Sequence, residues 1–74
     1  MKSLNDKRYR ILISRLKQAR LEKGMNQIAV AKHLKRPQSF ISKVENIERR
    51  LDAIELYDLM SLYGLSWDKL TDKL

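Results

Sequence analysis

The chain has 74 residues, of which 43% are hydrophobic, enough for one small core and too many for a disordered tail. Its 16 Lys or Arg residues outnumber 9 Asp or Glu, which leaves a net charge of +7 that suits an anionic partner. The lack of cysteine excludes disulfides and thiolate metal sites, and the short apolar runs exclude a membrane span. We therefore expect a single cytoplasmic domain that covers residues 1–74.

The first predicted helix covers residues 6–23 and follows a loose N-terminal arm formed by residues 1–5. Its apolar residues recur at i, i+3, i+4, i+7 and i+10, which is the stripe of an amphipathic helix. They are Tyr9, Leu12, Ile13, Leu16 and Ala19. Ser3 or Asn5 is expected to cap the helix at its start, and Gly24 is expected to end it in the left-handed conformation.

Two short helices joined by a tight turn are predicted between Asn26 and Asn46. Asn26 can cap the first helix, and Pro37 suits the first turn of the second, where its missing N–H costs nothing. The apolar residues on one face are Val30, Ala31 and Leu34 in the first helix and Phe40, Ile41 and Val44 in the second. Helices so short and so closely joined must cross steeply, which is the helix-turn-helix geometry.

The outward face of the second of these helices carries amides, hydroxyls and one cation that can bond base edges in a major groove. The candidate base contacts are Gln38, Ser39, Ser42 and Lys43. A merely solvated polar face is the ordinary alternative. The charge distribution favours nucleic acid, because residues 1–50 carry a net +10 and residues 51–74 a net −3.

Two more helices complete the chain. Asp52 and Glu55 have the spacing of a capping box, and Gly64 is expected to close the helix that they open. Its apolar residues are Leu56, Leu59, Met60 and Tyr63 on one side and Ile54 and Leu62 on the other. Ser66 is expected to cap a last helix with Trp67, Leu70 and Leu74. The predicted fold is therefore all-α, with five short helices around one core.

The combined spacing over residues 16–70 resembles the Xre/phage-repressor (Cro/C1-type) class of helix-turn-helix proteins. The matching segments are Arg20-Leu-Glu-Lys-Gly24-Met-Asn-Gln27, Val30-Ala31 and Ile41-Ser-Lys-Val-Glu45-Asn46. The resemblance implies a lambda-repressor-like fold and sequence-specific binding of double-stranded DNA. It also implies an ion pair between Arg20, which lies at the edge of the first apolar stripe, and Glu45, with a structural role for both.

Four side chains are expected to contact DNA phosphates. The resemblance implies this role for Gln27, at the N-terminus of its helix, and for Arg49 and Arg50, in a loop that follows the DNA backbone in this class. We add Arg36 to the same set.

Two positions depart from the class, because Lys35 and Ile47 stand where it usually has glycine. A β-branched residue resists positive φ. We therefore expect either that Asn46 takes the left-handed conformation in place of Ile47, or that the helix continues toward Glu48.

These observations predict a transcriptional repressor that binds a palindromic operator as a homodimer. The expected dimer interface is Trp67, Leu70 and Leu74, with help from Ile54 and Leu62. The alternative for these residues is that they simply close the core. The alternative is an antitoxin or adaptor whose main partner is another protein. The sequence shows no feature of an enzyme, since it has no cysteine, no phosphate-binding glycine loop, no histidine besides His33 and no carboxylate–histidine spacing that suggests catalysis. No cofactor, membrane partner or small-molecule effector is expected.

Overall fold

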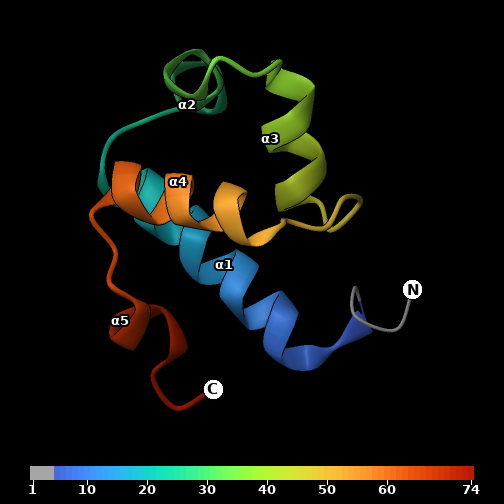
Figure 1. The fold of residues 1–74 in the computed structure, drawn as a ribbon, viewed down its shortest axis with the longest axis vertical. Helices are drawn as coiled ribbons and strands as arrows, with labels where there is room; N and C mark the ends of the chain where they lie inside the picture. Colours follow the sequence, from blue (N-terminus) through green and yellow to red (C-terminus); the bar gives the residue numbers. More distant parts are fainter. Residues whose placement is uncertain (1–4) are drawn as a thin grey trace.

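The computed structural model describes residues 5–74, which form five α-helices and no strand (Figure 1). The helices are α1 (Lys7–Glu22), α2 (Gln27–Leu34), α3 (Gln38–Glu45), α4 (Ala53–Tyr63) and α5 (Trp67–Thr71). The prediction of an all-α fold with five short helices is confirmed. The predicted arm at residues 1–5, with the proposed cap Ser3, lies outside the described residues except for Asn5.

The start of α1 differs from the prediction. Asp6 is the capping residue, and its carboxylate accepts the backbone N–H of Arg8 at 2.8 Å, so the prediction for Asn5 is wrong. Asp6 has extended backbone angles and a negative charge at the positive end of the helix dipole, both of which suit an N-cap. At the other end Gly24 has a φ of 73°, the left-handed conformation that the sequence predicted.

The turn between α2 and α3 is closed by backbone hydrogen bonds. Asn26 caps α2 as predicted, with its side chain accepting the N–H of Ala29 at 2.8 Å. At the end of α2, Lys35 is left-handed with a φ of 56°, and the next N–H, that of Arg36, bonds to Ala31 O at 2.9 Å. Pro37 lies just before α3 in an extended conformation, so it precedes the first turn and does not lie within it.

The loop after α3 overturns both expected alternatives. The helix ends at Glu45, Asn46 keeps a negative φ of −85°, and Ile47 itself adopts a φ of 60°. Two hydrogen bonds stabilise this disfavoured conformation, from Ile47 N to Val44 O at 3.1 Å and from Glu48 N to Lys43 O at 2.8 Å. Because Ile47 is also partly buried against the core, packing offsets part of its backbone strain.

The boundaries of α4 and the start of α5 agree with the sequence, but α5 ends at Thr71, so Leu74 lies beyond the helix. Asp52 and Glu55 form the predicted capping box, in which each side chain accepts the other residue's backbone N–H. Gly64 closes α4 with a φ of 66°, and Ser66 caps α5. No helix in residues 5–74 is long and apolar enough to cross a membrane.

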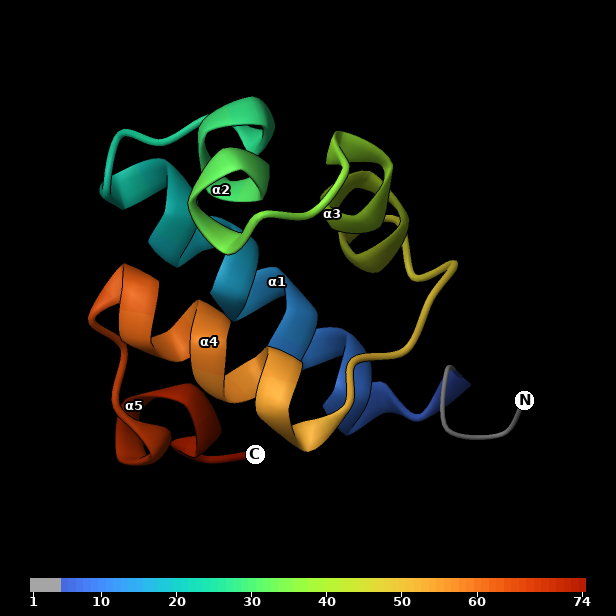
Figure 2. The ribbon, with the colours of Figure 1, turned by 45° about the horizontal axis from the view of Figure 1, so that its top comes forward.

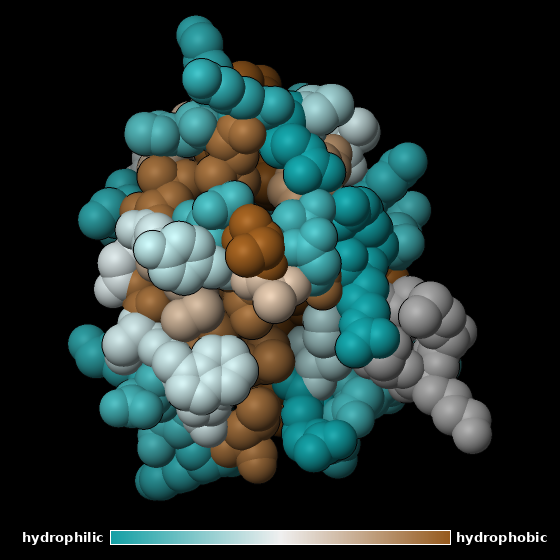
Figure 3. All heavy atoms as spheres, viewed as in Figure 1, coloured by the Kyte–Doolittle hydropathy of each residue, from teal (hydrophilic) through white to brown (hydrophobic). Residues whose placement is uncertain are grey.

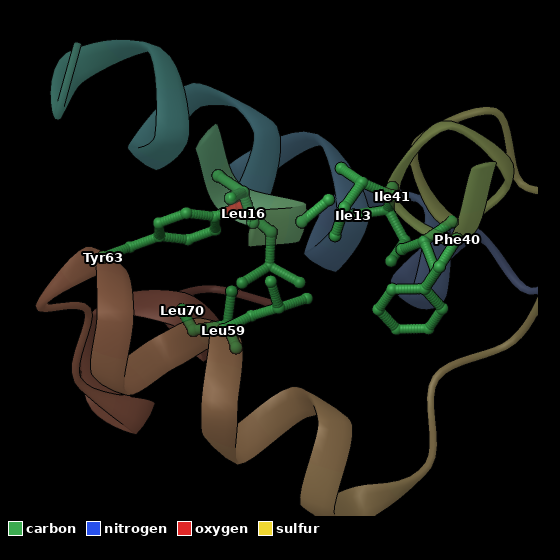
Figure 4. Close-up of a cluster of buried hydrophobic side chains, with 10 residues drawn as sticks. Ile13, Leu16, Phe40, Ile41, Leu59, Tyr63 and Leu70 are labelled. Carbon is green, nitrogen blue, oxygen red and sulfur yellow. The ribbon is translucent and has the colours of Figure 1, made fainter. Parts of the chain in front are cut away.

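The helices surround a core that α1 organises. α1 contacts α3, α4 and α5, while α2 and α3 pack against each other on the side of the molecule opposite α5 (Figures 1 and 2). Ten buried side chains form the core (Figure 4). They are Ile13, Leu16, Val30, Ala31, Phe40, Ile41, Val44, Leu59, Tyr63 and Leu70.

The burial of Leu70 corrects one functional prediction. Its side chain is completely buried, and it lies with Leu59 and Tyr63 in the same cluster (Figure 4). Arg15 donates a hydrogen bond to the Leu70 carbonyl at 2.8 Å, which also ties α5 to α1. Leu70 therefore holds α5 on the core, and the prediction that it lies in a dimer interface is wrong.

Candidate nucleic-acid interface

α3 separates its apolar and polar residues onto opposite faces. Phe40, Ile41 and Val44 are buried, because their spacing places them all toward the core. The four predicted base contacts lie on the remaining surface, with Ser42 half-buried and the others exposed: Gln38, Ser39, Ser42 and Lys43. The outer face of α3 thus presents donors and acceptors from rigid helical positions at the edge of the fold (Figure 2).

A buried ion pair connects α1 with the last residue of α3. Arg20 donates from Nε to Glu45 Oε2 at 2.7 Å and from Nη2 to Glu45 Oε1 at 3.0 Å, and each side chain is only 7% exposed. A third bond runs from Arg20 Nη1 to the Met25 carbonyl at 2.9 Å. The hydrogen bonds to Glu45 raise the pKa of Arg20 above its already high usual value, so the guanidinium stays charged.

Gln27 extends this ion pair to the protein surface. Its Nε2 donates to Glu45 Oε1 at 2.9 Å, and its Oε1 accepts from Gln38 Nε2 at 3.4 Å. Because a carboxylate can only accept, the amide nitrogen of Gln27 must face Glu45 and its oxygen must face Gln38. The chain from Arg20 to Gln38 therefore orients the first side chain of α3 and leaves the oxygen of its amide for an external donor.

Arg36 and Arg49 meet at a single carboxylate. Glu55 accepts from Arg36 Nη1 at 3.1 Å and from Arg49 Nη1 and Nη2 at 2.8 and 2.9 Å. The two guanidinium carbons lie 4.0 and 4.7 Å from the centroid of the Phe40 ring, in cation–π geometry. We call Arg36, Arg49, Glu55 and Phe40 the arginine cluster.

The arginine cluster was not predicted. The sequence indicated Glu55 only as a capping partner, and nothing local links positions 36, 49 and 55. The hydrogen bond from Arg49, followed by weaker contributions from Asp52 and Arg36 against the opposing effect of burial, lowers the pKa of Glu55 to about 2. The carboxylate is therefore ionised at any pH at which the protein would bind DNA.

Arg50 takes a different direction from Arg49. It borders a surface hollow with Arg8 and Tyr9 of α1 and with Leu74. The Tyr9 hydroxyl accepts the N–H of Leu51 at 3.2 Å, which holds this part of the loop against α1. Of the four predicted phosphate contacts, the structure thus joins Arg36 with Arg49 and places Arg50 on the side of the loop that faces α1.

The predicted dimer residues differ in their exposure and surroundings. Trp67 is 56% exposed on α5, whereas Leu74 lies in the hollow beside α1, and Leu62 packs against the core. Apolar side chains show between hydrophilic ones on the face that α4 crosses (Figure 3). Ile54 and Tyr57, one turn apart on α4, are 70% and 67% exposed. Tyr57 was not among the predicted interface residues, although its spacing from Ile54 places it on the same face.

Comparison with known proteins agrees with this geometry. A family model described as Helix-turn-helix matches residues 16–70, which is 55 of the 74 residues and includes α2, α3 and the arginine cluster. No curated protein and no solved structure matches the chain significantly.

Proposed function

The chain belongs to the Cro/C1-type helix-turn-helix family of DNA-binding regulators, and from this premise we propose that it is a cytoplasmic transcriptional repressor that binds a palindromic operator as a homodimer. The observation that supports this most directly is the polar face of α3, whose first side chain is oriented by a chain of hydrogen bonds that starts at the buried Arg20–Glu45 pair. We propose no catalytic role, cofactor or small-molecule effector.

In this proposal α3 is the recognition helix. Gln38 suits an adenine, to which an amide can bond at N6 and N7, and Lys43 suits the O6 and N7 acceptors of a guanine. Ser39 and Ser42 lie between them on the exposed side of α3 and complete the proposed base contacts.

Phosphate contacts would position α3 in the groove. The N-terminus of α2 presents backbone N–H groups beside Gln27, an arrangement that binds anions. Arg36, Arg49 and Arg50 provide cations on the turns that flank α3. The net charge of +10 on residues 1–50 supports the same orientation.

A homodimer would solve the problem that one recognition helix reads too few base pairs for selectivity in a genome. We propose an interface that includes Trp67 and Leu74, with Ile54 as a further apolar contact. The adaptor remains a second candidate function, because the exposed pair Ile54 and Tyr57 on α4 would also suit a protein partner.

Selection of bound duplexes from random sequence tests the proposed function. We expect a palindromic operator and an affinity that falls steeply with salt. Three arginines from each protomer of a dimer predict a log–log slope of about −5. An adaptor would select no sequence, and any binding to duplex DNA would be non-specific and driven by charge alone.

Variants of the parent protein then separate base contacts from phosphate contacts. Gln38→Ala should relax the preference at one base position by about 1–3 kcal/mol, as Lys43→Ala should at another. Arg50→Ala should weaken all duplexes equally. Affinities for the selected operator and its single-base variants measure both effects. A uniform loss for Gln38→Ala would move that residue to the phosphate contacts.

A further inference from the structure

We propose that Glu55 determines how well this protein discriminates its operator from other DNA, by holding Arg36 and Arg49 in fixed positions at the two ends of α3. Glu55 is then a positioning residue, which acts on DNA through the two arginines. The inference rests on the proposed function and adds to it a residue on α4, outside the helix-turn-helix itself.

The first argument is the position of the two arginines in the chain. Arg36 lies in the turn that enters α3, and Arg49 lies in the loop that leaves it. Glu55, in the first turn of α4, contacts both, so one carboxylate connects the two flanks of the recognition helix. Any movement of α3 relative to α4 would break one of these contacts.

The second argument is that Glu55 is itself immobilised. Its side chain is 11% exposed, and Oε1 accepts the backbone N–H of Asp52 at 3.0 Å as part of the capping box. The two guanidinium groups share one ring, that of Phe40 at the end of the buried cluster (Figure 4), and two cations so close repel each other. The charge of Glu55 offsets that repulsion and lets both remain over the ring.

The third argument is that both arginines can still reach an external anion. Their side chains are each 38% exposed. Of the five N–H groups on each guanidinium, Glu55 accepts one from Arg36 and two from Arg49, and the Arg50 carbonyl accepts a third from Arg49. Phosphates can therefore bind the outward edges of two guanidinium groups that are already ordered. The side-chain entropy that binding normally costs is then lost on folding and not on binding.

Glu55 has opposite effects on the two kinds of DNA. Binding to arbitrary duplexes depends mainly on total charge, and Glu55 reduces the charge of the arginine cluster from two positive charges to one. Binding to the operator also requires that Arg36 and Arg49 lie at defined phosphates while α3 reads bases. Glu55 thus weakens binding to arbitrary duplexes and supports binding to the operator. It therefore raises the ratio of operator affinity to non-specific affinity.

The test compares Glu55→Gln with Asp58→Asn. Glutamine keeps the length of the side chain and can serve in a capping box, but it loses the charge. Asp58 lies on the same helix and borders the same hollow as Arg36, Phe40 and Glu55, and it forms no ion pair within residues 5–74. Asp58→Asn therefore makes the same change in net charge without disturbing the arginine cluster.

Affinities are measured for a duplex selected from random sequence with the parent protein and for a shuffled duplex of the same length and composition. For Glu55→Gln we expect tighter binding to the shuffled duplex, no gain for the selected one, and a ratio about tenfold lower. For Asp58→Asn we expect both affinities to rise by the same factor. If Glu55→Gln changes both affinities equally, as Asp58→Asn does, the inference is overturned.

One further variant, together with the selection by the parent protein, separates the possible outcomes. Arg49→Lys retains the charge but loses the two-pronged contact with Glu55, so it should also lower the ratio of selected to shuffled affinity. An unchanged ratio for Arg49→Lys would count against the inference even if Glu55→Gln failed to fold. If the parent protein selects no duplex at all, the proposed function fails. If the parent selects one and Glu55→Gln keeps its ratio, only the role of Glu55 fails.

Discussion

Two ion pairs of nearly equal length differ in their surroundings. Arg20 and Glu45 meet at 2.7 Å with both side chains 7% exposed, whereas Arg8 and Asp6 meet at 2.8 Å with side chains 71% and 35% exposed. Water screens the pair of Arg8 and Asp6 and competes for its hydrogen bonds, whereas the pair of Arg20 and Glu45 is shielded from water by the protein. Distance alone therefore says little about the contribution of either pair to stability.

Arg20→Ala should destabilise the domain by about 3–5 kcal/mol, because it leaves Glu45 buried without its cation. Urea unfolding of the parent and the variant measures the difference. Arg8→Ala is the matched control, since it removes an ion pair of the same length from the surface, and its midpoint should stay close to that of the parent. Equal midpoints for Arg20→Ala and the parent would contradict the proposed structural role of the buried pair.

Glu55 should make stability depend on pH in the acid range. Its pKa falls from 4.5 to about 2 on folding, chiefly through the hydrogen bond from Arg49. A carboxyl whose folded pKa is lowered contributes stability that is complete above its unfolded pKa and is lost as pH falls toward the folded value. The advantage of the parent over Glu55→Gln should therefore shrink between about pH 4.5 and pH 2.

Urea midpoints of both proteins across this range measure the effect. The pKa of Asp6 is also lowered to about 2, by its hydrogen bonds with Arg8, but Asp6 is present in both proteins and cancels in the difference. A difference that stays constant over the range would show that the charge of Glu55 contributes nothing to stability.

At the scale of elements, α2 and α3 are each followed by a left-handed residue that is not glycine. Lys35 after α2 is exposed with a φ of 56°, and Ile47 after α3 is partly buried with a φ of 60°. The same backbone conformation therefore costs strain at both positions, but only Ile47 recovers energy from packing on the core.

Lys35→Gly should stabilise the domain by about 1 kcal/mol, because relief of the strain exceeds the added flexibility of the unfolded chain. Lys35→Ala keeps a Cβ at positive φ and should give no such gain. Ile47→Gly should destabilise despite the same relief, since it removes a side chain from the core. The midpoints of urea unfolding of the three variants measure these effects. A loss of stability for Lys35→Gly would contradict the proposed strain at this position.

At the scale of the whole molecule, the basic surface and the exposed Trp67 lie in different parts of the chain. The positive charge is concentrated in residues 1–50, which include α2 and α3, and the exposed Trp67 belongs to α5 on the opposite side (Figure 1). A protomer can therefore present α3 to DNA while α5 remains accessible to a second copy.

Trp67→Asp should convert the proposed dimer to a monomer and weaken operator binding, without changing the unfolding midpoint of the protomer. Leu21→Asp is the control, because Leu21 is 53% exposed, close to the 56% of Trp67, but lies on α1 outside the proposed interface. Sedimentation with and without operator measures the assembly. A parent protein that binds one asymmetric site as a monomer would contradict the dimer.

The features that the sequence determined by itself are local ones. The caps at Asn26, Asp52 and Ser66, the left-handed glycines and the apolar faces of α2 and α3 follow from residues within one or two helical turns. These interactions join residues that are close in sequence, so each helix and its polar face can be predicted from the local sequence. The resemblance to a known class also predicted one contact between distant residues, the ion pair of Arg20 with Glu45.

Three features were decided only by the tertiary structure. Leu70 became a core residue because α5 packs on α1, and Ile47 became left-handed because packing offset its strain. The contact of Arg36 and Arg49 with Glu55 joins three separate segments, and it exists only because the fold places both flanks of α3 beside the start of α4. A local pattern cannot predict such contacts, because their energy depends on the distance between the charged groups. The packing of the other helices determines that distance.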